Sequence, residues 1–454
     1  MIRANATWRL VAVAGAAGLV LAACGSDDDS SGDEGSEPAA TGTPLYLVDG
    51  NVGSGPLGEL EPGTLEGTKG TLPGAQISDD LKERLNQVDP KLVRIGYSYA
   101  PESYDAVMLV ALSAQQAQSD AGRDMAAEMQ DISAGGTKCT TFAECNDLIS
   151  QGEDIDYDGA SGPVEFDDFG DPTSASIGIY QYDAKNTVPG YNADGEALAY
   201  QSGEIAPTEG NPPALTDKKN DGADGQLQIG GYLPLTGSLA SLGPPEVAAV
   251  ELAIDEVNDE GGVLGKPIQW FPGDSSDSSN FDKGTQTIQG HISKGVDAIV
   301  GAASSSVSLN TLKLVTDAGI LQISPANTSP DLTTFKDGGL FFRTAPSDVL
   351  QGRILADLLL ADGVQNLAII SLQDAYGEGL AKYTTLPFEE GGGTVVTEPD
   401  TEEKAIFYDP TAQSFSAEVT EIAGLDPDAI VLIGFDESAK VVEELVKQGI
   451  GPNS

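Results

Sequence analysis

The chain has 454 residues, a length that fits two or three domains or a single two-lobed α/β protein. Acidic residues outnumber basic ones by 71 to 23, and the formal net charge of −48 argues against nucleic acid or anionic lipid as an electrostatic partner. The hydrophobic fraction of 40% is enough for a sizeable buried core.

The first residues have the pattern of an export signal. Arg3 and Arg9 precede the apolar run 10–23, which is too short to span a bilayer comfortably. The run ends in LAAC at Cys24, which resembles the lipobox of bacterial lipoproteins, whose cysteine becomes lipidated. An ordinary cleaved signal with an incidental cysteine is the alternative. We expect residues 1–23 to be removed, Cys24 to anchor the protein to the outer face of the cell membrane, and residues 24–42 to form a disordered acidic tether.

Two further cysteines, Cys139 and Cys145, lie in the segment CTTFAEC. Exported proteins meet an oxidising environment, so we expect a disulfide bond that staples a short helical turn. A catalytic thiol pair is the poorer alternative, because the CxxC spacing is not present.

From Gln226 to the end, predicted strands and helices alternate, which favours parallel sheets with helices on both faces. The predicted strands are 227–235, 267–271, 296–301, 320–324, 366–372, 393–398 and 429–435. The predicted helices are one with Val247, Val250, Ile254 and Val257 on a single face, and then 281–294, 306–318, 347–362, 378–391, 412–424 and 436–450.

Residues 43–206 have a different organisation. The predicted elements there are a strand at 44–50, helices near 77–88, 101–117 and 121–133, and strands within 161–166 and 174–183. Segment 207–225 is rich in Pro, Gly and Asp and has the composition of a linker.

The two ends of this pattern complement each other. In an α/β protein the helix at 436–450 would normally lead into another strand, and no strand follows it. The strand PLYLVDG at 44–50 has no helix before it. Joined end to start, the two segments would form an ordinary helix–turn–strand passage, so we expect 44–50 to be the missing strand.

Segment 226–454 resembles the first two-thirds of the leucine/isoleucine/valine-type solute-binding proteins of ABC importers, in stretches such as GYLPLTGSLASLG, AIDEVNDEGGVLG, ISPANTSPDLT and FFRTAPSDVLQG. Segment 44–185 resembles the last third, in YLVDG, LEGTKGTLPGA and SYDAVMLVALSAQQA. The resemblance implies one complete binding domain with its last third moved in front, a circular permutation. A mis-assembled gene would give the same order.

The fold implied by the resemblance is the type I periplasmic-binding-protein fold, in which two α/β lobes, each a mainly parallel sheet flanked by helices, are joined by a three-stranded hinge. One lobe would combine roughly 226–345 with 73–165. The other would combine roughly 346–454 with 43–72 and the strand at 174–183. The linker 207–225 would join the ancestral termini, which lie near each other in most domains.

Polar residues follow two predicted strands of the first lobe. Ser304–Ser306 lie between a strand and a helix, where hydroxyls and free backbone N–H groups suit a carboxylate, and plain helix capping is the alternative. In the family a serine here binds the ligand's α-carboxylate, and Ser305 is the matching position. Ala326 matches a backbone-carbonyl contact of the family, and Thr328 matches a contact through its hydroxyl and N–H.

Two residues of the second lobe complete the site that the resemblance implies. Tyr376, in AYGEG, would lie over the ligand, and Asp49, in YLVDG, matches the acidic residue that pairs with the α-ammonium group. An amino acid needs both of its charges met once water is excluded. Leu242 and Phe435 stand near positions where the family has aromatic residues, with Asp436 as an alternative match, so the pocket is expected to be more apolar or differently shaped.

A calcium-loop pattern occurs in the segment DIDYDGASGPVE, residues 154–165. An EF-hand needs a helix after the loop, whereas Pro163 and the residues that follow indicate a strand. A solvated turn is the preferred interpretation, with calcium binding as the alternative.

The sequence favours binding over catalysis. His291 is the only histidine and has no nucleophile motif beside it, and no Walker A or GxGxxG pattern is present. We expect an extracytoplasmic, monomeric, non-enzymatic lipoprotein without cofactor or metal, which delivers a small ligand, a branched-chain or related amino acid, to ABC permease subunits. The alternatives are a ligand-sensing receptor component for an amide or other small polar metabolite, and an exported enzyme.

Overall fold

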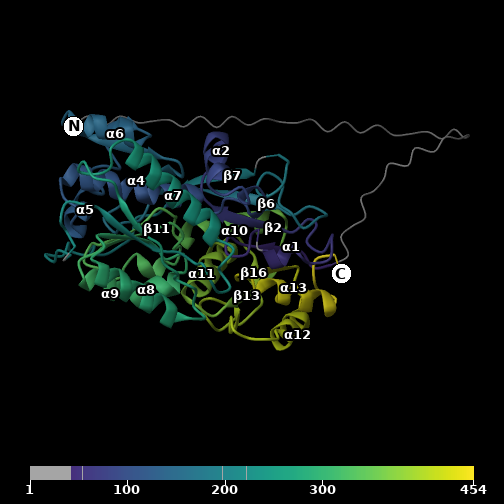
Figure 1. The fold of residues 1–454 in the computed structure, drawn as a ribbon. Coiled ribbons are helices and arrows are strands. Elements are labelled where there is room, and N and C mark those ends of the chain that lie inside the picture. The colour runs from purple at the N-terminus through teal and green to yellow at the C-terminus, as the bar shows by residue number, and fades with distance from the viewer. Residues whose placement is uncertain (1–41, 54, 197, 221, 454) are drawn as a thin grey trace, which may run out of the picture. The chain divides into compact units, whose positions relative to one another are not determined.

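The computed structural model describes residues 42–453 apart from 54, 197 and 221. The predicted signal peptide, Cys24 and nearly all of the tether lie outside these residues. The described residues form two large sheets with flanking helices, which we name lobe 1 and lobe 2 (Figure 1). Each lobe combines residues from before and after the linker, as the fold prediction required.

Lobe 1 is built on a sheet of five described strands, all parallel, in the order β12-β11-β10-β8-β9. The strands are β8 (Gln228–Tyr232), β9 (Gln269–Phe271), β10 (Ala298–Gly301), β11 (Leu321–Ser324) and β12 (Phe341–Arg343). Every residue of β10, β11 and β12 is buried, as expected for strands that are covered on both faces.

Helices cover both faces of this sheet. One hydrophobic cluster joins Ala298 and Val300 to α2 (Asp79–Val88), α4 (Ala100–Ala117), α5 (Gly122–Glu128), α6 (Phe142–Ser150) and α7 (Gly243–Asp259). A second joins Ile299 to α8 (Phe281–Lys294) and α9 (Ser305–Asp317). Successive residues of a strand point to opposite faces, so β10 separates two helical layers.

Lobe 2 is built on a sheet of eight described strands, in the order β14-β13-β16-β1-β2-β6-β7 with β15 paired to β13. The strands are β1 (Leu45–Leu47), β2 (Lys69–Pro73), β6 (Ser174–Gln181), β7 (Ala199–Glu204), β13 (Asn366–Leu372), β14 (Thr394–Val395), β15 (Ile406–Tyr408) and β16 (Ala429–Ile433). The main helices are α10 (Asp348–Ala361), α11 (Ala375–Glu390), α12 (Ser416–Leu425) and α13 (Ser438–Lys447). Only the β2–β6 and β6–β7 pairs are antiparallel among these described strands.

A strand from the start of the chain completes this sheet. β1 lies between β16 and β2 and is parallel to both, with Leu45 opposite Ile430 and Tyr46 opposite Val431. All three residues of β1 are buried. In space, β1 therefore takes the place of the strand expected after the last helix.

A crossing is a segment that connects the last element in one lobe to the next element in the other lobe. Segments 74–78, 164–173 and 344–347 are the three crossings expected from the fold. The linker is a further crossing, because β7 belongs to lobe 2 and β8 to lobe 1. The described chain therefore has the three crossings of the expected hinge, and the linker is an additional connection between the lobes.

The linker is held against lobe 1 by hydrogen bonds, although its described residues form no helix or strand. The N–H of Thr216 donates to the carbonyl of Gly338 at 2.8 Å, and Arg123 donates to the carbonyl of Thr216 at 2.9 Å. Further along, Asn220 Nδ2 donates to Asp297 Oδ1 at 2.6 Å. This segment therefore packs against lobe 1, although its composition is that of a linker.

Some elements carry too little hydrophobic signal to be predicted. β7 contains no buried residue, β15 is short, and α6 follows Thr141, whose hydroxyl caps it by accepting from the N–H of Glu144 at 3.2 Å. α11 begins at Ala375 rather than at 378, because the Asp374 carboxylate accepts from the N–H groups of Tyr376 and Gly377 and starts the helix there.

The predicted disulfide bond between Cys139 and Cys145 is confirmed, with the Cα atoms 5.3 Å apart. It joins the end of β3 (Thr137–Cys139) to α6 rather than stapling a single helical turn. None of the helices in the described ranges combines the length and the apolarity that crossing a membrane requires.

The calcium-like segment 154–165 is a β-hairpin of β4 (Ile155–Gly159) and β5 (Gly162–Pro163). Its Asp156 and Asp158 carboxylates each contact Lys138 Nζ at 3.0 Å. Across the described ranges, no group of three or more His, Cys, Asp or Glu side chains could hold a metal ion.

Candidate ligand-binding site between the lobes

A small cavity lies where the two lobes meet, close to the carboxyl ends of strands from both sheets. Its lining residues are Asp49, Gly50, Tyr376 and Phe435 from lobe 2, and Tyr99, Leu239, Leu242, Ala303, Ser304, Ser305 and Ala326 from lobe 1. Of the seven ligand contacts expected from the sequence, all line this cavity except Thr328.

Asp49 is the charged centre of this cluster. It lies two residues after the end of β1 and is 4% exposed. Its Oδ1 accepts from Tyr376 Oη and from Gln351 Nε2, both at 2.7 Å, and its Oδ2 accepts from Tyr99 Oη at 2.6 Å. Burial raises the pKa of this carboxyl, and the three donors oppose that rise. None of the described lining residues is Lys, Arg or His, so the cavity offers an anionic acceptor that a ligand ammonium group can meet.

Two of the three side chains that donate to Asp49, Tyr99 and Gln351, were not predicted from the sequence. Tyr99 precedes α4 with φ at 57°, a left-handed conformation that a bulky residue adopts only where the surroundings enforce it. Gln351 lies in the first turn of α10 and is buried beside β2, where its Nε2 also contacts Thr71 Oγ1 at 3.2 Å. A single tyrosine or glutamine carries no motif, so only the structure could identify them.

The serines of lobe 1 lie on the opposite side of the cavity. Ser304 caps α9 by accepting from the N–H of Val307 at 3.5 Å, so the capping interpretation holds for that residue. Ser305 Oγ accepts from the N–H groups of Thr328 and Ser329 at 3.3 and 3.2 Å. A hydroxyl that accepts in this way can still donate its own hydrogen, which suits a carboxylate. Thr328 does not line the cavity, but its N–H donates to Ser305, which does.

Aromatic and aliphatic side chains form the remaining walls. The rings of Tyr376 and Phe435 are stacked, with centroids 5.7 Å apart and an interplanar angle of 11°. Leu239 and Leu242 are buried on the lobe 1 side. Of the two residues that could match the aromatic position of the family, Phe435 lines the cavity and Asp436 does not. A ligand with an apolar side chain would find these surfaces beside its charged groups.

The lobes are closed on each other in this structure. Beyond the Tyr99–Asp49 bond, the N–H of Ala375 donates to Ser306 Oγ at 2.9 Å, and the N–H of Asp436 donates to the carbonyl of Ser238 at 2.9 Å. The cavity measures only ≈ 10 Å³, about the space of one water molecule. Admitting a ligand therefore requires the lobes to separate.

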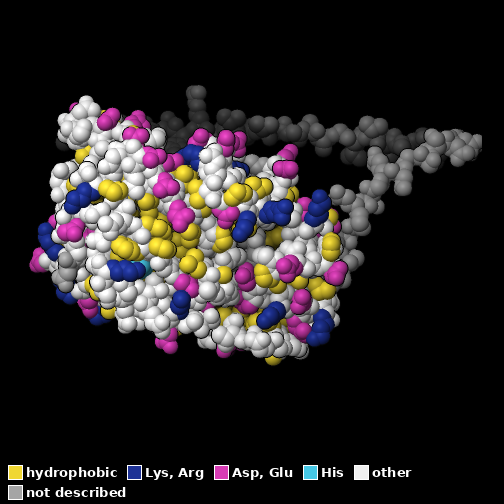
Figure 2. Space-filling view, viewed as in Figure 1, with side chains coloured by type: hydrophobic (Ala, Val, Ile, Leu, Met, Phe, Trp, Pro, Cys, Tyr) yellow, Lys and Arg dark blue, Asp and Glu magenta, His cyan; other side chains and the backbone are white. Residues whose placement is uncertain are grey.

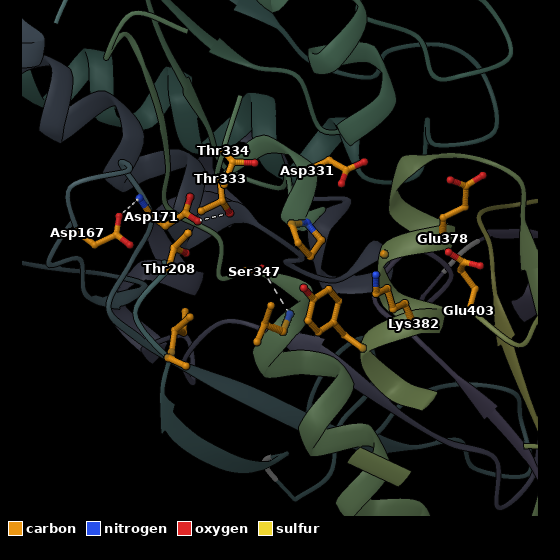
Figure 3. Close-up of a pocket in the computed structure, with 16 residues that line it drawn as sticks. Asp167, Asp171, Thr208, Asp331, Thr333, Thr334, Ser347, Glu378, Lys382 and Glu403 are labelled. Atoms are coloured by element: carbon orange, nitrogen blue, oxygen red, sulfur yellow. Dashed lines mark hydrogen bonds between the residues drawn. The ribbon is translucent and has the colours of Figure 1, made fainter. Parts of the chain in front are cut away.

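A wider groove of ≈ 350 Å³ opens between the lobes beside this site (Figure 3). Asp331 projects from lobe 1, and Glu378, Lys382 and Glu403 project from lobe 2. Lys382 is paired with Glu402 at 2.7 Å. Exposed acidic side chains such as Asp331 and Glu378 line this groove, and its buried carboxylate, Asp171, is already paired with Arg343, so the smaller cavity is the better candidate.

The surface agrees with the charge balance of the sequence. On the face shown in Figure 2, Lys and Arg side chains are scattered among Asp and Glu side chains and form no continuous basic patch. Nucleic acid is therefore not favoured as a partner of this face.

Two α/β lobes that close over a buried carboxylate on one side and serine hydroxyls on the other define a hinged solute-binding protein. The chain belongs to the periplasmic binding protein family, which residues 226–453, half of the chain, match. Residues 78–185 match a second family, described as a receptor family ligand binding region. Both family descriptions refer to binding.

Curated relatives carry the names of amino-acid-binding proteins. Leu/Ile/Val-binding protein homolog 3 of Brucella melitensis is 28% identical over 46% of this chain and 54% of its own length. Leu/Ile/Val-binding protein BraC3 of Rhizobium johnstonii is 29% identical over 47% of this chain and 56% of its own length. The chain thus spans about half the length of the curated relatives it matches.

Similar solved structures align over half of this chain. The substrate binding protein LivJ of Streptococcus pneumoniae, in complex with isoleucine, is 28% identical with a TM-score of 0.43, covering 50% of this chain and 62% of that one. A solute binding protein of R. palustris, in complex with 4-hydroxybenzoate, is 16% identical with a TM-score of 0.42, covering 50% and 59%.

Proposed function

We propose that the protein captures a small α-amino acid between its lobes and delivers it to an ABC importer, as a lipoprotein anchored at Cys24 outside the cell membrane. The observation that carries this proposal is the position of Asp49 opposite Ser305 across one closed cavity. Asp49 is a buried carboxylate that forms no ion pair within the described part of the chain, and Ser305 presents a hydroxyl at a helix N-terminus. These groups suit the ammonium and the carboxylate of one small zwitterion.

The walls suggest the side-chain class of the ligand. Leu239, Leu242 and Phe435 are apolar, so a branched-chain or related amino acid would bury its side chain against them. The names of the curated relatives support the same class. Ala326 and Thr328 remain in the proposed site, Ala326 through its backbone carbonyl and Thr328 through its bond to Ser305.

We also infer that segments 43–206 and 226–454 are the last third and the first two-thirds of one binding domain in permuted order. The pairing of β1 with β16 supports this inference, because it joins the start of one segment to the end of the other. In this proposal, the linker 207–225 connects the ancestral termini.

A sensing role is the second candidate. The match of residues 78–185 to a receptor family ligand binding region supports a ligand-sensing component, for which an amide or another small polar metabolite would be the ligand. Deleting the gene separates the two roles: loss of uptake of the ligand supports the importer, and normal uptake with a lost response supports the sensor.

The ligand itself can be identified directly. Mass spectrometry of compounds released from purified, denatured protein should recover an α-amino acid, and titration calorimetry with that compound should give one site per chain. Metabolic labelling with a fatty-acid analogue should mark the wild type and leave Cys24→Ser unmarked. Recovery of a compound without an amino group would contradict the amino-acid assignment.

A further inference from the structure

A second cavity of ≈ 330 Å³ lies at the hinge, away from the Asp49 cluster. The three expected crossings contribute Gly74, Val164 and Thr344 to its lining, β6 contributes Ser174, and β7 contributes Ser202 and Glu204. It shares no lining residue with the cavity at Asp49. A molecule bound here would contact all three of those crossings at once.

One buried carboxyl group of this cavity has an unused oxygen. Glu102, in the first turn of α4, is 1% exposed, and its Oε1 has no hydrogen-bond partner among the residues that the structure describes. The carboxyl lies against Gly74, where an added Cβ would stand 2.5 Å from Oε1. The backbone carbonyl of Glu102 accepts from Thr344 Oγ1 at 2.9 Å, which fixes the residue in the cavity wall. A buried acceptor without a donor is unfavourable unless a ligand supplies the donor.

The surroundings of Glu102 are rich in acceptors and poor in cations. None of the described residues that line the cavity is Lys, Arg or His. Glu204 adds an exposed carboxylate at the rim, and the exposed Arg353 donates only to its backbone carbonyl, at 3.4 Å. The buried Glu246, whose two carboxyl oxygens also lack partners, adds a second acidic group near Glu102. Such a lining suits a small cation that carries N–H donors.

We propose that the hinge cavity is a second ligand site, which takes a small primary ammonium ion and binds it through the carboxylate of Glu102. The hydroxyls of Ser174 and Ser202 would accept its remaining N–H groups. This site is independent of the proposed amino-acid site, since the two cavities use different residues. Because the crossings line it, its occupant would also favour one hinge geometry.

Binding at this site should release a proton. Burial raises the pKa of Glu102 to about 8, so the free carboxyl holds a proton at pH 7. An ammonium ion favours the carboxylate, and the proton passes from Glu102 to the buffer as the ion pair forms. The ammonium keeps its own hydrogens, and no bond of the ligand breaks.

The test is titration calorimetry of the full chain with n-propylammonium chloride at pH 7. Titrations in phosphate and in MOPS, buffers that contain no primary ammonium ion and differ in their heats of ionisation, separate the heat of binding from the heat of buffer protonation. We expect saturable binding with release of close to one proton in the wild type, and loss of both in Glu102→Gln. Glu204→Gln, which changes only the rim, should keep the proton release, and Asp49→Asn should keep it as well.

If Glu102→Gln does not fold, a second variant tests the same site. Ser202 is exposed at the mouth of the cavity, and Ser202→Lys should weaken n-propylammonium binding by about tenfold or more through charge repulsion. The proposal is overturned if the wild type shows no saturable heat. It is also overturned if Glu102→Gln, or in its place Ser202→Lys, binds as tightly as the wild type, or if Asp49→Asn alone abolishes binding.

Discussion

Arg343 and Asp171 form a buried bidentate ion pair. Through Arg343, this pair connects the loop of lobe 1 that contains Ser329 to the hinge crossing 164–173. Arg343 Nε and Nη2 each donate to one Asp171 oxygen at 2.6 Å, and the two side chains are 0% and 5% exposed. The same guanidinium donates through Nη1 to the carbonyl of Ser329 at 2.9 Å. Ser329 in turn donates to Ser305, so the pair supports the proposed carboxylate contact from behind.

Replacing Arg343 with lysine should destabilise the protein and weaken ligand binding together. A lysine cannot make the two parallel hydrogen bonds to Asp171 and also donate to the carbonyl of Ser329. The buried carboxylate of Asp171 therefore loses most of its hydrogen bonds to a cation. We expect a loss of about 3 kcal/mol in the free energy of unfolding, measured by chemical denaturation. Lys382→Ala, which removes the exposed pair with Glu402, should change it by less than about 0.5 kcal/mol. Equal effects of the two substitutions would contradict this role for Arg343.

Asp49→Asn should weaken binding of the amino acid by about 2–5 kcal/mol, because the ligand ammonium loses its buried counter-charge. The amide keeps the size of the side chain, so thermal unfolding without ligand should change much less than affinity. Calorimetric titration measures the effect, and Asp400→Ala, at an exposed position, is the control. An affinity within twofold of the wild type would rule out the ammonium pairing.

Tyr376→Phe separates the two roles of this residue. The substitution removes the hydroxyl that donates to Asp49 at 2.7 Å and keeps the ring that stacks on Phe435. We expect a loss of about 1 kcal/mol in ligand affinity, the usual contribution of one hydrogen bond. Tyr376→Ala removes the stacked wall as well and should cost clearly more. If both variants bind alike, the ring does not contact the ligand.

The free energy of unfolding should fall as the pH rises from about 4.5 to about 8, in part because of Glu102. The unfolded chain loses this proton near 4.5, whereas burial raises the pKa to about 8 in the folded protein. The folded state therefore holds more protons within this window, and stability decreases with pH there, by up to roughly 5 kcal/mol for this residue. Glu102→Gln should flatten the profile measured by denaturation at several pH values, and the exposed Glu83→Gln should not. A profile that keeps its slope in Glu102→Gln would show that the buried carboxyl is not the source.

A chain rewired as 226–453 followed by 43–225 should fold and bind with similar affinity. It keeps the pairing of β1 with β16 and β2 and the contacts of the linker, and it changes only loop closure, a term of about 1 kcal/mol. Residues 226–453 alone should aggregate, because they lack β1, α4 and Asp49 and leave the edge of β16 uncovered. Thermal unfolding with and without ligand distinguishes these outcomes. A stable, ligand-binding 226–453 fragment would exclude the permuted domain.

Elements with a strong local pattern were predictable, and long-range contacts were not. The helix at 281–294 and the strand at 366–372 have the predicted bounds, because a regular hydrophobic period marks them. α4 is buried over Ala100–Ala114, so it shows little of the amphipathic pattern that would reveal which face meets the site. Asp49, Ser305 and Tyr376 were proposed through the family resemblance, whereas Tyr99 and Gln351 depend on how α4 and α10 pack, which no local pattern encodes.

The position of β1 has a consequence for the order in which the protein is made. Ribosomes deliver β1 and β2 first and β16 last, yet Leu45 pairs with Ile430 in the centre of the lobe 2 sheet. The helix α4 also emerges before β10 and β11, the strands that it covers. The early part of the chain must therefore wait, with an unpaired strand and an uncovered helix, until β10, β11 and β16 have been synthesised. Holding chaperones should thus matter more for this chain than for a relative whose sheets form from consecutive segments.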